Sequence, residues 1–97
     1  MSKNLTIIAR IQAKAEKVDF IKSEATKLIE PTQKENGCIQ YDLLQDNEKP
    51  EVFVFYEKWE SIELWQKHME SDHLKGFVGS TEGALGGLDV SQMTLVS

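Results

Sequence analysis

The stretch that decides the fold runs from Tyr56 to His73 and reads Tyr-Glu-Lys-Trp-Glu-Ser-Ile-Glu-Leu-Trp-Gln-Lys-His-Met-Glu-Ser-Asp-His. It begins inside a β-prone run, Val52–Trp59, and ends in residues with helical spacing. Ser61 stands between the two patterns and predicts a helix N-cap. The stretch holds both tryptophans and both histidines of the chain. Aromatic, imidazole and carboxylate groups beside a strand end are typical of a small-molecule pocket.

Two strands and a long helical segment are predicted before this stretch. Leu5–Ile11 alternates between apolar and mostly polar residues, and residues 38–45 alternate again. Between them, residues 15–36 show helical spacing, which Asn36-Gly37 ends because glycine tolerates the left-handed cap conformation. The polar segment Asp46–Pro50 predicts a hairpin connection to the next strand.

Pro31 interrupts the long helical segment. A proline removes one backbone donor and clashes with the preceding turn, so we expect a kink or a break near Lys27–Glu30.

A second helical region and a last strand follow the central stretch. Ser71-Asp72 offers a second cap and predicts a short helix through Leu74 to Val78. Gly79–Gly87 contains four glycines and is predicted to be a mobile loop or a lid. Leu88–Val96 alternates in the manner of a closing strand.

The predicted order β-α-β-β-α-β indicates an α+β, ferredoxin-like antiparallel sheet with both helices on one face, in one domain over residues 1–97. Strands 38–45 and 52–59 nevertheless carry apolar side chains on both faces. A second copy of the chain is the simplest cover for the other face, so a homodimer is predicted.

The composition of the chain disfavours some classes of binding partner and indicates a cellular location. A net charge of −5 without a Lys/Arg cluster disfavours nucleic acids and anionic membranes as partners. Leu5–Ile11 is too short to span a bilayer and is interrupted by Arg10, and we see no secretory signal. The single cysteine, Cys38, is interpreted as a small buried residue, and its lack of a partner fits a reducing cytoplasm.

His68 is the candidate catalytic residue. An unperturbed imidazole titrates near neutrality and can remove a proton from a phenol or hydroquinone. The helical spacing puts His68 on one face with Trp65, toward the sheet and Glu57. The alternative is a structural role, in which His68 only hydrogen-bonds Glu57 or a backbone group. Arg10 could pair with an acid across a dimer or meet an anionic substrate.

The other candidate pocket residues are aromatic or lie beside a helix start. Trp65 is the best candidate for a pocket wall, and Tyr41 and Tyr56 are weaker ones, whereas Trp59 is interpreted as a core or interface residue. His73 reads as a capping or surface residue. No metal is predicted, because an i, i+5 pair on a continuous helix points about 140° apart, although a bend between the histidines could bring them together.

Three motifs resemble the antibiotic-biosynthesis-monooxygenase-like (ABM) family, and especially its bacterial quinol monooxygenases. They are Pro31-Thr32 followed by Glu35-Asn-Gly-Cys-x-x-Tyr41, Phe55-Tyr-Glu-x-Trp-x-Ser61, and His68-x-x-Ser-x-His73 followed by Leu74-Lys75. The resemblance covers nearly the whole chain and implies a dimeric ferredoxin-like domain, a dimeric α/β-barrel.

The resemblance implies a cofactor-independent monooxygenase acting on a quinol-like or polyphenolic molecule. The family also contains isomerases and haem-degrading enzymes. Haem degradation is rejected here, because Leu5–Ile11 contains no asparagine and His68 and Val78 stand where that branch has its tryptophan and its iron-binding histidine. No flavin, haem or metal cofactor is expected. Two alternatives stay open: a small dicarbonyl isomerase or tautomerase that uses His68, and a non-catalytic small-molecule-binding module.

Overall fold

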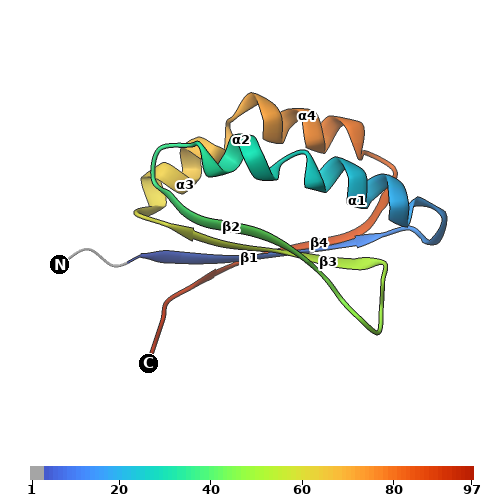
Figure 1. Cartoon of the computed structure of the whole chain (residues 1–97), viewed down its shortest axis with the longest axis horizontal. Coiled ribbons are helices and arrows are strands. Elements are labelled where there is room, and N and C mark those ends of the chain that lie inside the picture. The colour runs from blue at the N-terminus through green and yellow to red at the C-terminus, as the bar shows by residue number, and fades with distance from the viewer. Residues whose placement is uncertain (1–3) are drawn as a thin grey trace.

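A computed structural model, which describes residues 4–97, consists of a four-stranded sheet with all helices on one face (Figure 1). The strand order is β2-β3-β1-β4, and each neighbouring pair is antiparallel. This arrangement confirms the predicted α+β ferredoxin-like fold. The elements are β1 (Leu5–Ala13), η1 (Ala15–Lys17), α1 (Val18–Thr26), α2 (Ile29–Gln33), β2 (Cys38–Gln45), β3 (Val52–Trp59), α3 (Ile62–Met69), α4 (Asp72–Ser80) and β4 (Leu85–Met93).

The first helical segment breaks where the proline predicts. α1 ends at Thr26 and α2 begins at Ile29, so the break falls at Lys27–Leu28. Pro31 then lies in the first turn of α2, where a backbone N–H has no partner within the helix in any case. The expectation of a break near Lys27–Glu30 is confirmed.

Two serines shape the second helical region. Ser61 caps α3 by accepting a hydrogen bond from the Leu64 N–H at 3.2 Å, as predicted. Ser71 caps α4 by accepting from the Leu74 N–H, and its hydroxyl also donates to the His68 carbonyl at 2.7 Å. Ser71 therefore fixes both the end of α3 and the start of α4, and the chain bends between them.

The core lies between the helices and the inner face of the sheet. The central strand β1 contributes Ile7 and Ile11, and β3 contributes Phe53 and Trp59, all fully or almost fully buried. They share one apolar core with Ile21 and Ala25 of α1, and the burial of this core stabilises the fold. Trp59 is a core residue, in agreement with its interpretation from the sequence.

Two details of the sheet correct the sequence analysis. The register of β2 shifts between Cys38 and Gln40, so Cys38 packs against the core while Ile39 is about half exposed. β4 spans Leu85–Met93 rather than 88–96, because it pairs with β1 from Ala13 onward.

The outer face of the sheet carries no helix among the described residues (Figure 1). Ile8 lies beside Tyr56 there, and Val54 lies beside Leu44, so apolar groups adjoin across strands. Arg10 is exposed on the same face. Across residues 4–97, no helix has the length and apolar character needed to cross a membrane.

Gly37 holds the corner between α2 and β2. Its φ is +87°, and a Cβ there would lie 2.8 Å from the Leu64 Cβ and would collide with the Leu64 Cδ1. We expect Gly37→Ala to lower the free energy of unfolding by about 2 kcal/mol, from backbone strain and overlap together. Urea denaturation measures this.

Gly76→Ala is the matched control for that substitution. Gly76 lies exposed in α4, with no atom within 4 Å of the added Cβ, so the change should stabilise the chain by about 0.5–1 kcal/mol. Equal effects of the two substitutions would show that Gly37 is not under this constraint.

Candidate functional site

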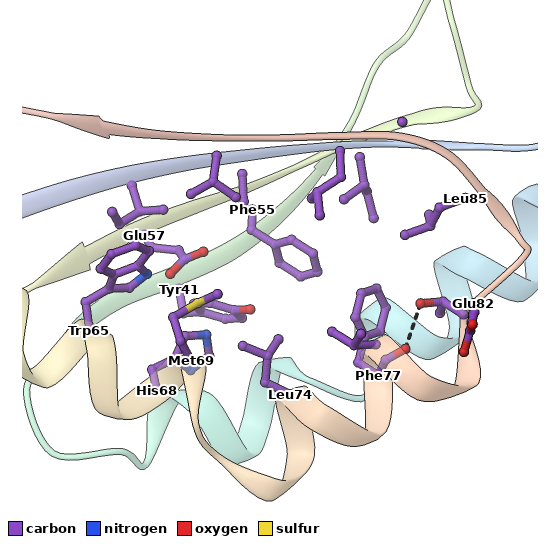
Figure 2. Close-up of a pocket in the computed structure, with 18 of the residues that line it drawn as sticks. Tyr41, Phe55, Glu57, Trp65, His68, Met69, Leu74, Phe77, Glu82 and Leu85 are labelled. Carbon is purple, nitrogen blue, oxygen red and sulfur yellow. Dashed lines mark hydrogen bonds between the residues drawn. The ribbon is translucent and has the colours of Figure 1, made fainter.

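A cavity of about 480 Å³ lies between the sheet and the helices α3 and α4 (Figure 2). Its walls are mostly apolar and include Phe55 from the sheet, Trp65 from α3 and Phe77 from α4. Glu57 and His68 lie at one end, and the turn after α4 lies at the other (Figure 2). The volume is in the range of ligand pockets, and polar groups at one end of an apolar cavity favour a ligand with a polar head.

His68 lies at the polar end and is enclosed by aromatic rings. Its ring centroid is 4.9 Å from the Trp59 ring and 5.4 Å from the Tyr41 ring. Burial lowers the pKa of His68, although the nearby Glu35 carboxylate acts in the opposite direction. The neutral imidazole is therefore favoured, which is the form that can accept a proton.

Glu35 contacts His68 and was not predicted as a site residue from the sequence. It lies in the bend between α2 and β2, and its Oε2 is 2.7 Å from Nδ1 of His68. The structural alternative for His68 named Glu57 or a backbone group as its partner. The imidazole instead contacts Glu35, and Oε1 of Glu57 accepts a hydrogen bond from the Trp59 indole at 2.9 Å. The available signal was the position of Glu35 beside Gly37, in a motif that the family resemblance includes.

The same oxygen of Glu35 also contacts His73. Nε2 of His73 lies 2.7 Å from Oε2 of Glu35, because the bend at Glu70–Ser71 turns α4 back toward α3. A carboxylate oxygen accepts hydrogen bonds, so Nδ1 of His68 and Nε2 of His73 are the donors in these two contacts. His68 then has Nε2 left to meet a ligand in the cavity.

The bend between α3 and α4 brings together three side chains that could bind a metal ion. The two histidines were expected to diverge on a continuous helix, but the helix is not continuous, and the three ligand atoms of Glu35, His68 and His73 lie within 4.8 Å of one another. Two imidazoles and a carboxylate are ligands that suit zinc and related transition metals. The 2.7 Å contacts are equally explained by hydrogen bonds through one oxygen.

Glu57 is the second titratable group of the cavity. It projects from β3 between Phe55 and Trp59 on the inner face of the sheet and is 3% exposed. Burial raises its pKa to about 7, although the hydrogen bond from Trp59 lowers it. The environment therefore moves the pKa values of His68 and Glu57 in opposite directions, as in sites with one base and one acid.

The remaining predicted site residues separate into three groups. Trp65 and Tyr41 line the cavity, and burial strongly raises the pKa of Tyr41, which keeps its proton. Tyr56 does not line the cavity, which corrects its prediction as a pocket residue, because Phe55 and Glu57 face inward and the residue between them must face outward. His73 does not line the cavity either, which corrects its prediction as a pocket residue, and its ring contacts Glu35 instead.

The predicted mobile loop or lid over Gly79–Gly87 is also corrected. Gly79 belongs to α4, and Gly86 and Gly87 belong to β4, which leaves a turn of residues 81–84. This turn is held by the Thr81 hydroxyl, which donates to the Phe77 carbonyl at 2.7 Å (Figure 2). The segment still lines the far end of the cavity.

The sequence and the fold both have known relatives. The family described as "Antibiotic biosynthesis monooxygenase" matches residues 4–80. The chain belongs to this family. It is 34% identical over 92 residues to the Bacillus subtilis (strain 168) protein named "Putative monooxygenase YcnE". The aligned region covers 94% of this chain and 97% of that protein.

Solved structures give the same picture. PA3566 from Pseudomonas aeruginosa superposes with a TM-score of 0.95 and 30% identity, over 100% of this chain and 98% of that chain. A conserved protein from Methanosarcina mazei Go1 has a TM-score of 0.88 and 30% identity, over 96% of this chain and 93% of that chain. The predicted family membership is therefore confirmed, and the fold is shared over almost the whole length.

The raised pKa of Glu57 predicts a specific effect of pH on stability. The ordinary value is 4.5, so its contribution to folding is complete below about pH 4.5 and is lost as the pH rises through about 7. Glu57→Gln keeps an acceptor for Trp59 but cannot ionise. At pH 8 the variant should be more stable than the wild type by up to about 3 kcal/mol, relative to the difference at pH 4.5.

Urea denaturation of both proteins at several pH values tests this. Glu16→Gln, at an exposed position of η1, is the control and should follow the wild-type profile. If the profiles of Glu57→Gln and the wild type run parallel from pH 4.5 to 8, the buried carboxyl does not titrate as described.

Proposed function

We propose that this chain is a cofactor-independent monooxygenase that oxidises a quinol-like or polyphenolic small molecule, with His68 as the base. The observation that carries the proposal is the mostly apolar cavity with the imidazole of His68 at one end, whose Nδ1 is held by Glu35. Membership of the monooxygenase family and the name of the Bacillus subtilis relative support the same reaction type.

The proposed chemistry asks three things of the protein. A hydroxyl of the hydroquinone must lose its proton, water must be excluded, and developing negative charge must be stabilised. Nε2 of His68 would accept the proton, and the apolar walls around Phe55 and Phe77 would exclude water. Glu57, with its pKa near 7, would donate a hydrogen bond to the substrate in its protonated form.

Oxygen is the co-reactant. The hydroquinone anion passes one electron to O₂, and the resulting radical pair joins to form a carbon-bound peroxide. The C–H bond at the same carbon then breaks, its electron pair forms a C=O bond as the O–O bond cleaves, and the departing oxygen takes that proton and one from His68. The products are a hydroxyquinone and water. In this scheme His68 first removes a proton and later returns one.

A second candidate function uses the same two groups without oxygen. A base and an acid in one cavity, His68 and Glu57, are what an isomerase or tautomerase of a small dicarbonyl needs to move a proton between carbon and oxygen. Oxygen uptake distinguishes the candidates, because only the monooxygenase consumes O₂. Thermal stabilisation by a ligand without turnover would instead favour a binding module.

The functional unit is proposed to be a homodimer formed through the outer sheet face. This proposal is supported by the apolar side chains of Ile8, Val54, Tyr56 and Leu44 on the face that no described helix covers. Met93 extends the same face onto β4 and is about half exposed. Burial of such a patch against a second copy would stabilise a small domain.

The role of His68 can be measured with a substitution that keeps its hydrogen bond. In His68→Gln the side-chain amide can still donate to Glu35, but it cannot accept the substrate proton at neutral pH. Turnover of a hydroquinone, followed as oxygen uptake, should fall by about 10²–10⁴-fold. Tyr56→Phe, on the opposite sheet face, is the control and should keep wild-type turnover. Unchanged turnover in His68→Gln would remove His68 from the mechanism.

The dimer can be tested separately by analytical ultracentrifugation. The wild type should sediment at about twice the monomer mass of 11.0 kDa. Val54→Glu places a charge in the proposed interface and should shift the protein to monomers, because burial of an unpaired carboxylate is costly. Phe20→Glu, on the exposed side of α1, should leave the dimer intact. A wild type that stays monomeric at micromolar concentration contradicts the proposal.

A further inference from the structure

We propose that Glu35 and His73 form a proton path that connects His68 in the cavity to solvent. The path consists of Nδ1 of His68, Oε2 of Glu35 and Nε2 of His73, with two successive contacts of 2.7 Å. This proposal rests on the proposed function in one respect: the proton that His68 passes on comes from the substrate.

Burial of the three side chains decreases along this path. The side chain of His68 is 2% exposed, that of Glu35 is 17% exposed, and that of His73 is 26% exposed. The groups come from α3, from the bend before β2 and from α4, so the path leads out of the cavity wall between separate elements. A chain of hydrogen bonds with one buried end and one wet end is the geometry that proton transfer requires.

The proton needs such an exit because the side chain of His68 is almost fully buried. A buried imidazolium between the rings of Trp59 and Tyr41 is disfavoured by desolvation. The other titratable groups near it offer no route. Tyr41 keeps its proton, Glu57 is itself buried and bonded to Trp59, and burial raises the pKa of the Cys38 thiol to about 11.

Each transfer leaves the number of protons in the cluster unchanged. The path we propose starts with three protons in the cluster: one on Nδ1 of His68, one shared between Oε2 of Glu35 and Nε2 of His73, and one on Nδ1 of His73. When the substrate O–H bond breaks, its electron pair stays on oxygen and the proton binds Nε2 of His68. The Nδ1 proton of His68 moves to Oε2, the shared proton settles on Nε2 of His73, and the Nδ1 proton of His73 leaves to water.

The reverse passage resets the cluster. His68 gives its Nε2 proton to the reduced oxygen, and a proton from solvent travels inward through His73 and Glu35 to restore the proton on Nδ1. Ser71 holds the two histidines in position for this, because its hydroxyl bonds the His68 carbonyl and its Oγ caps the helix that carries His73. His73 and Glu35 are positioning and relay residues, and they do not line the cavity.

The test uses the fact that the chain contains two histidines, so ¹⁵N-histidine labelling shows only two imidazoles by NMR. We expect His68 to carry its proton on Nδ1 and to exchange it readily with solvent. In His73→Gln the side-chain amide still donates to Glu35 but cannot relay a proton, so exchange at Nδ1 of His68 should slow about tenfold or more. Imidazole added to the buffer should restore the rate, whereas pyrazole, of similar size but far less basic, should not.

The outcomes separate this proposal from the proposed function. Slowed exchange with rescue by imidazole supports the path, whether or not the wild type oxidises a hydroquinone. Exchange in His73→Gln at the wild-type rate, or a His68 proton on Nε2, overturns it even if the enzyme is an active monooxygenase. A metal ion bound stoichiometrically by both imidazoles, found by elemental analysis of the same sample, also overturns it, because the metal would replace the protons.

Discussion

The site depends on one carboxylate oxygen, Oε2 of Glu35, which meets an imidazole from α3 and another from α4. This contact joins the bend before β2 to both helices of the second helical region. It holds Nδ1 of His68 and so leaves Nε2 for the cavity, which is how an outer group commonly fixes the tautomer of a functional histidine. Two features of the backbone make this contact possible. The bend at Ser71 places His73 near Glu35, and the tight corner at Gly37 packs against Leu64 of α3.

The cavity itself follows from the way the helices cover the sheet. α3 and α4 leave space above β1 and β4 that Phe55, Phe77 and Trp65 surround without filling. Within that apolar space burial acts oppositely on the two titratable groups: it lowers the pKa of His68 and raises that of Glu57. The fold alone does not select a reaction, because related folds carry many chemistries. The proposed proton transfer rests instead on the two titratable groups that face the cavity.

Much of the fold could be predicted because the strands and helices have clear periods and the breaks have chemical causes. Pro31, Ser61 and Ser71 each act through their own backbone or side-chain chemistry, so their effects could be located from the sequence. The register shift in β2 and the early start of β4 could not, because both depend on pairing with other strands. Alternation predicted the inward direction of Glu57 correctly, and the same rule excludes Tyr56 from the cavity.

The candidate site was predictable only in part, for a related reason. His68, Trp65, Glu57 and Tyr41 lie on elements whose inner faces could be identified, and they do line one cavity. Glu35 lies 33 residues from His68, in a bend without any period, so its contact depends on how α2, α3 and α4 pack together. The cytoplasmic location and the absence of nucleic-acid partners stay predictions from composition.

A crystal structure with a bound hydroquinone tests the central claim most directly. The account predicts that its ring occupies the cavity against Phe55 and Phe77, with one hydroxyl within hydrogen-bond distance of Nε2 of His68 and with Nδ1 still on Glu35. A ligand bound elsewhere, on the outer sheet face for example, or bound in the cavity with its hydroxyls turned away from His68, would contradict it.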